Sequence, residues 1–331
     1  MEPLLEMPKH GDHTWYTCRK QINRNKNEHS MDQDQKRGPR MGNEEPGLLA
    51  RPHISYSQLG MYLRCSMQYY YAYILGLRRR PSLPMSVGSG GHKALEYNGR
   101  YKIRTGKDTP TSDLLDAAST FIDEFTDELT PEDLKGENKG EAKDRAIAAI
   151  GIYRTRDAIH VHPVGVEVEF NLDLNEPDQE PIRIINGKID LIAAIPQTPD
   201  IEVLDYKFAR AMKSQAEADL SPQLTLYGKV VKSLTGRYAA RTGLQVFTPG
   251  AARSAPDSRL VLRDAELMKP KAQERRFARL AHQFRIAEKG IHTGMFMPTD
   301  DPRVCSWCGF RDQCQSSLVT EYEAIKIRGE A

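Results

Sequence analysis

The sequence predicts an α/β protein in which helices flank a small mixed β-sheet. Apolar residues recur at helical spacing over residues 55–74, 92–104, 112–129 and 141–159. The pattern then changes to alternation in two segments, 164–174 and 182–195, which a polar turn separates into a hairpin. A third strand is expected at 201–208, then a helix at about 214–234, strands near 244–248 and 259–262, and a long helix at about 265–289. This element order is typical of a sheet with helices packed on it.

Local signals set the expected ends of the first helices. The hydroxyl of Ser55 can cap the helix that follows, and Cys65 falls inside this helix. Residues 81–84 are typical of a turn and lead into the glycine-rich segment 88–91, so the next helix is expected to begin at His92. The helices at 112–129 and 141–159, joined by the charged segment 131–140, indicate a helical insertion at about 108–160.

The chain divides into one domain with a tail at each end. Residues 1–50 are polar and show no sustained apolar period, which predicts a flexible tail, and residues 321–331 are expected to form a C-terminal tail. Deleting residues 1–48 is therefore expected to leave stability and activity nearly unchanged. The domain is assigned to residues 51–320, because 331 residues with ample apolar content can build one large core.

The charge and hydropathy of the sequence exclude several classes of protein. The formal net charge is only +2, from 47 basic and 45 acidic residues, so any basic surface for nucleic acid must be local. Candidate patches are Arg78-Arg79-Arg80 and the cluster of Arg275, Arg276 and Arg279, although a solvated helix face explains such runs equally well. No apolar stretch approaches the roughly 20 residues of a membrane span, and the first 15 residues lack the pattern of a signal peptide. A cytoplasmic protein without a membrane partner is expected, and no phosphate-binding Gly-Lys-Ser or Gly-Lys-Thr loop is present.

Two neighbouring strands carry the candidate chemistry. Asp205 and Lys207 stand two residues apart on the strand 201–208 and therefore project from one face, which Asp190 of the preceding strand could join. Carboxylates at strand ends are hard oxygen ligands for Mg²⁺ or Mn²⁺, and a nearby lysine can orient water and stabilise negative charge. These residues suit phosphodiester hydrolysis. A structural salt bridge between Lys207 and one aspartate is the alternative.

Four motifs in a fixed order extend this interpretation: residues 88–96, the strand of Asp190, Asp205-Tyr206-Lys207, and residues 223–227. Over residues 54–314 the chain resembles the RecB-like branch of the PD-(D/E)XK nuclease superfamily, which implies a restriction-endonuclease-like core. The resemblance implies that Lys207 is catalytic, with Asp190 and Asp205, and that a divalent metal is bound by His92, Asp190, Asp205 and the backbone carbonyl of Tyr206. Gln223 and Tyr227 match the family's Gln-x-x-x-Tyr element beside the active site and DNA.

Further contacts are weaker candidates. Glu96 lies one helical turn after His92 and could support the site from behind the ligands. The tyrosine-rich run 69–73, with Arg64 and the triplet Arg78, Arg79 and Arg80, could stack on bases and bind phosphates of a single strand. Tyrosines at helical spacing also serve as core, so the arginines are the preferred DNA contacts.

The cysteines indicate a second centre. Cys305-x-x-Cys308 is followed by Cys314, with Cys65 far upstream, whereas Cys18 lies in the tail and is not expected to be a ligand. These four cysteines resemble the subset of the family that carries a 4Fe-4S cluster, including CRISPR spacer-acquisition and AddB-type nucleases. A four-cysteine zinc site is the alternative, because spacing does not distinguish the two.

The expected function is that of an Mg²⁺- or Mn²⁺-dependent deoxyribonuclease. An exonuclease acting on DNA ends or single strands during recombination, repair or a related process is favoured. The alternatives are a catalytically silent DNA-binding or scaffold protein, and a nuclease subunit that works with a separate helicase, recombinase or integrase-type partner. An oligomer is compatible with the sequence.

Overall fold

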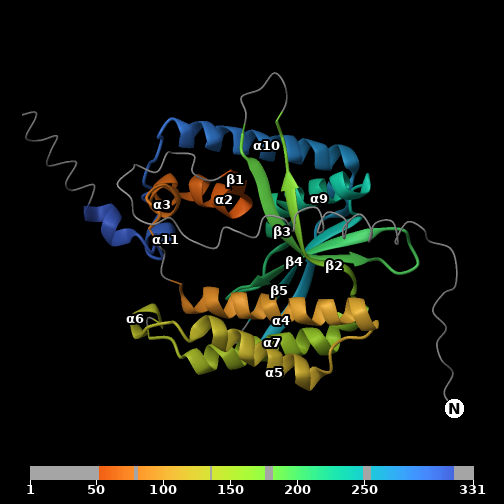
Figure 1. Cartoon of the computed structure of the whole chain (residues 1–331). Coiled ribbons are helices and arrows are strands. Elements are labelled where there is room, and N and C mark those ends of the chain that lie inside the picture. The colour runs from red at the N-terminus through yellow and green to blue at the C-terminus, as the bar shows by residue number, and fades with distance from the viewer. Residues whose placement is uncertain (1–51, 78–80, 135, 176–181, 249–254, 317–331) are drawn as a thin grey trace, which may run out of the picture.

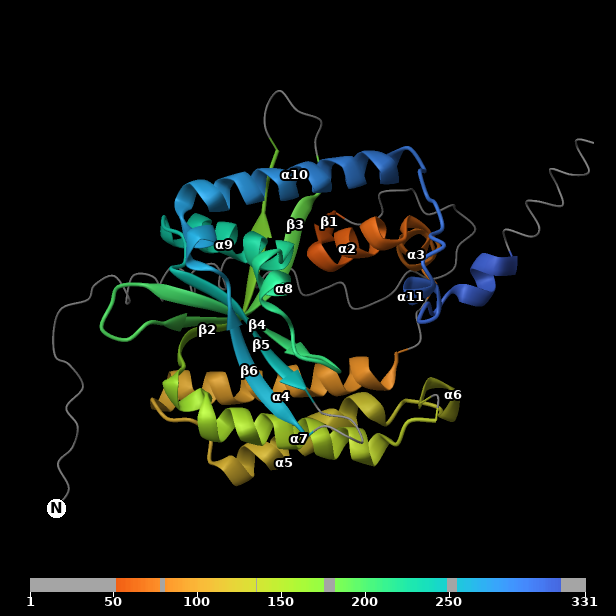
Figure 2. The same ribbon diagram turned by 180° about the vertical axis from the view of Figure 1, so that it is seen from behind.

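The computed structural model describes residues 52–77, 81–134, 136–175, 182–248 and 255–316. In this part of the chain, one sheet lies between two layers of helices, as Figure 1 and the reverse view in Figure 2 show. The mixed α/β architecture with helices on both faces is confirmed. The two predicted tails and the triplet Arg78-Arg79-Arg80 lie outside the described residues.

The sheet combines parallel and antiparallel pairs around the central strand β3. Its strands are β1 (His53–Ser55), β2 (His162–Leu172), β3 (Ile184–Ala194), β4 (Ile201–Phe208), β5 (Arg241–Thr248) and β6 (Asp257–Leu262). Strand β3 pairs antiparallel with β2 along one edge, which confirms the predicted hairpin. Its other edge pairs with β1 in parallel at one end and with β4 antiparallel at the other end. Strands β4 and β5 are parallel, and β6 is antiparallel to β5.

One face of the sheet is covered by helices from both halves of the chain. They are α2 (Tyr56–Arg64), α3 (Ser66–Tyr69), the π-helical turn η1 (Tyr70–Ile74), α8 (Gln215–Asp219), α9 (Pro222–Thr235) and α10 (Pro270–His292). Leu59 of α2, Leu226 of α9 and Phe284 of α10 are fully buried in one apolar cluster with the sheet residues Ile189 and Val203. Burial of side chains of this size is the main stabilising contribution in a domain of this kind.

The opposite face carries the helices α4 (Leu83–Thr105), α5 (Thr111–Thr126), α6 (Pro131–Leu134) and α7 (Lys139–Arg156). Leu95 of α4 and Tyr153 of α7 pack on Leu191 and Tyr206 of the sheet in a second cluster. The short elements η2 (Ala158–His160), η3 (Ala265–Met268) and α11 (Pro302–Cys305) complete the described chain. Helices α5, α6 and α7 occupy the range predicted as a helical insertion.

The first predicted helix is interrupted at Cys65, which the sequence pattern placed inside it. Ser55 caps α2 as expected, with its hydroxyl accepting from the amide of Gln58. Cys65 itself has an extended backbone, with φ −163° and ψ 103°, and the chain resumes as α3 and then as a π-helical turn. The prediction of one continuous helix over 55–74 is wrong, and Cys65 projects from a break between two helices instead.

Helix α4 begins nine residues earlier than the glycine pattern indicated, at Leu83 instead of His92. The glycines are inside the helix because neighbouring elements approach its backbone closely. A β-carbon on Gly90 would lie 2.5 Å from Cα of Ile122 in α5, and one on Gly91 would overlap the ring of Phe208. Tertiary packing therefore outweighs the low helix propensity of glycine here.

Two later helices begin at prolines, after the start that the sequence pattern predicted. The predicted helix 214–234 is divided into α8 and α9, because Ser221 caps the second helix and Pro222 occupies its first turn. The predicted helix 265–289 begins as the 3₁₀ turn η3, and α10 starts at Pro270. Within the described residues, no helix is both long and apolar enough to cross a membrane.

Candidate active site

The candidate site lies where β3 and β4 separate. The two strands pair from Ala194 and Ile201 up to Leu191 and Leu204, and the pairing ends immediately before Asp190 and Asp205. Strand β1 pairs with the same edge of β3 only at residues 184–186. Among the described residues, no strand therefore pairs with this edge of β3 at residues 187–190, and Asp190 stands at the fork.

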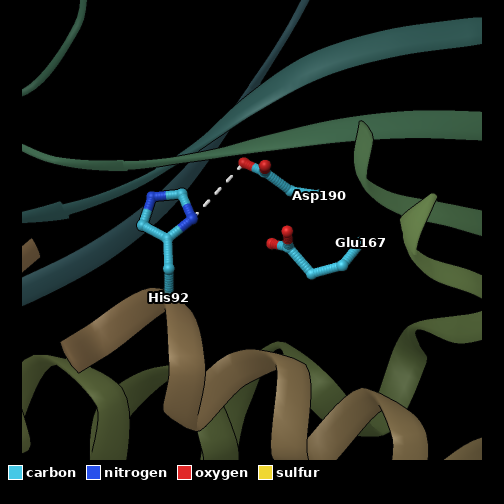
Figure 3. A group of neighbouring side chains, drawn as sticks. All are labelled: His92, Glu167 and Asp190. Carbon is cyan, nitrogen blue, oxygen red and sulfur yellow. Dashed lines mark ion pairs between the residues drawn. The ribbon is translucent and has the colours of Figure 1, made fainter. Parts of the chain in front are cut away.

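Asp190 is held at the fork by the backbone of β4. The amide of Tyr206 donates a hydrogen bond to Oδ2 of Asp190 at 2.7 Å. From the other side, α4 presents His92, whose Nδ1 lies 3.7 Å from the same carboxylate oxygen (Figure 3). Two residues about 100 positions apart in the chain are thus brought together, as the ordered motifs led us to expect.

Lys207 of β4 lines the same cleft and is surrounded by polar groups. Its Nζ lies 2.7 Å from Oδ2 of Asp205 and donates to Oε1 of Gln223 at 3.0 Å. Nε2 of Gln223 donates to the hydroxyl of Tyr227 at 2.7 Å. Gln223 and Tyr227 stand one turn apart on α9, so their side chains share a face. Burial, followed by the charge of Asp205, raises the pKa of Tyr227, so its hydroxyl stays protonated.

The electrostatics of the site favour a cation. Burial and the positive charge of Lys207 lower the pKa of His92 to about 4, so its imidazole is neutral near pH 7 and keeps a free nitrogen lone pair. Burial and the neighbouring charge of Asp205 raise the pKa of Asp190 well above its usual range. Burial also raises the pKa of Asp205, while Lys207 opposes that effect. A neutral imidazole beside crowded carboxylates is a donor set that fits Mg²⁺ or Mn²⁺.

Glu167 is a member of this group that the sequence pattern did not reveal. Ligand atoms of His92, Glu167 and Asp190 lie within 4.8 Å of one another, and Figure 3 shows the three side chains turned toward a common point. Glu167 comes from β2, where the flanking pairs Val166–Leu191 and Val168–Ile189 place it opposite Asp190. The acidic alternation of Glu167 and Glu169 in an otherwise apolar strand was the available signal, but it does not distinguish a site residue from a solvent-facing one.

An open cleft of about 740 Å³ adjoins these residues. Its lining includes His92, Glu96, Glu167, Asp190 and Lys207, together with apolar residues of α4 and β4. Asp205 is almost completely buried and lies behind Lys207 instead of lining the cleft. Glu96, predicted as outer support, forms an ion pair with Arg100 at 2.6 Å.

Arg64, the predicted arginine contact that lies within the described residues, is separate from this cleft. Arg64 is in the last turn of α2, where its guanidinium donates to Gln68 at 3.4 Å, and it does not line the cleft. The tyrosines after it are largely packing residues: Tyr69 and Tyr71 are buried, and the ring centroid of Tyr70 lies 5.0 Å from that of Phe296. This favours the core interpretation for Tyr69 and Tyr71.

The four candidate ligand cysteines surround a second cavity. Cys65, Cys305, Cys308 and Cys314 all line a space of about 170 Å³ between α3 and the C-terminal segment. No disulfide joins any two of these four cysteines. Burial raises the pKa of the Cys314 thiol, and the other three cysteines add to the effect through their negative charge. Four thiols that line one small cavity fit a bound metal centre. Deprotonated thiols this close together need a cation to compensate their negative charges.

The sequence of this chain matches a known protein family. The family model described as the PD-(D/E)XK nuclease superfamily matches residues 53–315. No curated protein sequence matches the chain. Among solved structures, one described as "Crystal structure of SSO0001" has 14% sequence identity and a TM-score of 0.30, and the match covers 91% of this chain and 94% of that chain.

Proposed function

The chain belongs to the PD-(D/E)XK nuclease superfamily, and from this premise we propose that it is a metal-dependent deoxyribonuclease. The observation that supports this most strongly is the grouping of His92, Asp190 and Lys207 along one open cleft, although they come from α4, β3 and β4. Hydrolysis of a phosphodiester needs a divalent cation, a positioned water and a positive group for the developing charge. The residues of the cleft match these needs.

His92, Asp190 and the backbone carbonyl of Tyr206 would hold Mg²⁺ or Mn²⁺ from the wall of the cleft, with Asp205 as a ligand from its buried position behind Lys207. When bound, the cation would polarise the scissile phosphate and make an attacking water more acidic. Asp190 is already oriented by the amide of Tyr206, so its carboxylate needs little rearrangement to bind. Neutral His92 would supply a nitrogen donor from α4.

Lys207 would be the catalytic lysine. Asp205 and Gln223 fix its ammonium from two sides, which leaves the third N–H for a water or a phosphate oxygen. An ammonium group positioned in this way orients the water and stabilises negative charge in the transition state. Its pairing with Asp205 does not reduce it to a structural salt bridge, because Lys207 also lines the cleft.

For the cysteines we propose a 4Fe-4S cluster bound by Cys65, Cys305, Cys308 and Cys314. Support comes from their shared cavity and from the absence of a disulfide among them. A zinc ion held by the same four thiolates is the alternative. In either case the centre would join α3 to the C-terminal segment and take no part in phosphate chemistry.

DNA ends or single strands are the proposed substrates, in recombination, repair or a related process, with Arg64 and the arginines 78–80 as proposed contacts. A helicase, recombinase or integrase-type protein is the proposed class of partner. A catalytically silent DNA-binding protein is less well supported, because His92, Asp190, Asp205 and Lys207 are all present.

The experiment is digestion of end-labelled single-stranded, double-stranded and circular DNA by the purified full chain. Cleavage is expected with Mg²⁺ or Mn²⁺ and should stop when a chelator is added. If the enzyme is an exonuclease, circular DNA should not be cleaved. Lys207→Ala should abolish cleavage while DNA binding and the melting temperature stay near those of the unaltered protein. Lys213→Ala, at a partly exposed lysine paired locally with Glu217, is the control. Undiminished cleavage by the Lys207 variant, or cleavage in chelator, would contradict the proposal.

A further inference from the structure

We propose that Glu167 is a further ligand of the divalent cation, so that β2 contributes to the metal site together with α4 and β3. This inference rests on the proposed function and adds a residue that neither the motif order nor the family assignment singles out. The starting point is the group His92, Glu167 and Asp190, whose ligand atoms lie within 4.8 Å of one another at the wall of the cleft.

Both strands of the β2–β3 hairpin change face at this position. In a regular strand, residues two apart point to the same side. Val166, however, packs in the cluster beneath α4, whereas Val168 packs in the cluster beneath α9 and α10. Opposite them, Leu191 and Ile189 are divided between the same two clusters. Glu167 and Asp190 stand at the point of the switch, so neither is committed to an apolar core and both reach the cleft.

The backbone of Glu167 accounts for the switch on β2. Its φ is +48°, in the left-handed region that residues other than glycine rarely adopt. Glutamate, unlike glycine, is strained at this φ. The strain is retained because the adjacent residues of the strand are well packed. Strained backbone of this kind clusters at functional sites, where it directs a side chain that a regular strand would turn elsewhere.

Glu167 also lacks a charged partner of its own. The two basic side chains whose charges act on Glu167 are ion-paired with other residues: Lys188 with Glu169 at 3.1 Å and Arg100 with Glu96 at 2.6 Å. Within the described part of the chain, Glu167 forms no ion pair. A partly buried carboxylate beside Asp190 is costly unless a cation compensates both charges. A divalent metal at this point would do so.

The test measures binding of Mn²⁺ alone to the full chain, by titration followed with electron paramagnetic resonance and calorimetry in the absence of DNA. Glu167→Gln keeps the shape of the side chain and should weaken Mn²⁺ binding at least tenfold, as Asp190→Asn should. Glu169→Gln removes the neighbouring acid of the same strand, which is ion-paired to Lys188, and should leave binding unchanged.

Glu167→Gly separates ligation from folding. Glycine adopts positive φ without strain, so this variant should melt at or above the temperature of the metal-free unaltered protein and still bind Mn²⁺ at least tenfold more weakly. Binding by Glu167→Gln and Glu167→Gly equal to that of the unaltered protein, with Asp190→Asn impaired, would overturn the role of Glu167 and leave the proposed nuclease intact. No Mn²⁺ binding by the unaltered protein would overturn both.

Discussion

The position of the Lys207 ammonium is determined by its neighbours on two elements. Asp205 approaches from the same strand, two residues away, and Gln223 approaches from the first turn of α9. Asp205 attracts the ammonium group but does not fix its orientation, because an ammonium can rotate around a single carboxylate. Gln223 adds the second fixed point, and its own amide is held by the hydroxyl of Tyr227. Gln223 therefore positions Lys207, and Tyr227 positions Gln223.

This order of support predicts a graded effect on turnover. Gln223→Ala should lower kcat by about 100-fold, the effect of misplacing a catalytic group by roughly 1 Å, with little change in KM or melting temperature. Tyr227→Phe should lower kcat less, because Gln223 keeps its bond to Lys207. The measurement is the rate of cleavage of labelled DNA under saturating conditions. Gln283→Ala on α10, a glutamine that does not line the cleft, is the control. Equal turnover by the Gln223 variant and this control would show that Asp205 alone suffices.

Individual site residues differ in how far the sequence could predict them. Asp205 and Lys207 follow from strand periodicity, and their side chains do meet. His92 and Asp190 depend on motif order, because periodicity alone does not bring α4 to the end of β3. Glu167 could not be predicted, since regular alternation would have placed it beside Glu169 on one face. Its side chain is redirected by a positive φ, with Val166 and Val168 packed on opposite sides of the sheet, and alternation of residue types carries no signal for such a φ.

At the scale of elements, the packing of α4 places His92 in the site. Gly90 lets the backbone of α5 approach, and Gly91 accommodates the ring of Phe208. Both glycines lie within two residues of His92, so the distance from α4 to α5 depends on Gly90 and the distance from α4 to β4 depends on Gly91. A larger side chain would displace the helix, and His92 with it.

The expected consequence is a loss of stability that the same substitution elsewhere does not cause. Gly90→Ala should destabilise the fold by about 1–3 kcal/mol, the usual cost of overpacking, because the backbone of Ile122 cannot move aside as a flexible side chain could. Gly60→Ala is the matched control: Gly60 lies inside α2 with no atom within 4 Å of an added β-carbon. This control should gain about 0.5–1 kcal/mol from helix propensity. Denaturant unfolding measures both, and equal effects of the two substitutions would contradict the packing role of Gly90.

The same glycines explain why element boundaries were the weaker part of the prediction. A run of glycines is locally a turn signal, and only the proximity of α5 and β4 makes it a helical contact surface. Similarly, β1 has only three residues and gains its pairing from β3, which is about 130 positions later in the chain. The hairpin of β2 and β3 and the strand β4 were predictable because their signals are local.

At the scale of the whole molecule, the two ends of the domain meet at the cysteines. The hydroxyl of Ser66 both accepts from the amide of Met297, at 2.6 Å, and contacts its carbonyl, at 3.1 Å. Tyr62 donates to the carbonyl of Met295 at 2.8 Å, and Phe296 packs on Tyr70. These contacts lie on partly exposed surface and include few fully buried side chains. A metal centre in the adjoining cavity would therefore contribute much of the stability of this junction.

The prediction that follows concerns metal content and stability together. Protein purified without oxygen should be brown and contain iron and sulfide in a ratio near one, as expected of a 4Fe-4S cluster. Cys308→Ala should remove the colour and lower the melting temperature by roughly 5 °C or more, the shift expected for a loss of about 2 kcal/mol in a domain of this size. Cys18→Ala, outside the described residues, should change neither. Absorption spectra, metal analysis and thermal unfolding provide the measurements. Colourless protein with one zinc per chain would establish the zinc alternative. Metal-free protein with an unchanged melting temperature would show that contacts such as Ser66–Met297 hold the two ends together without a centre, and that the shared cavity of the four thiols has no structural role.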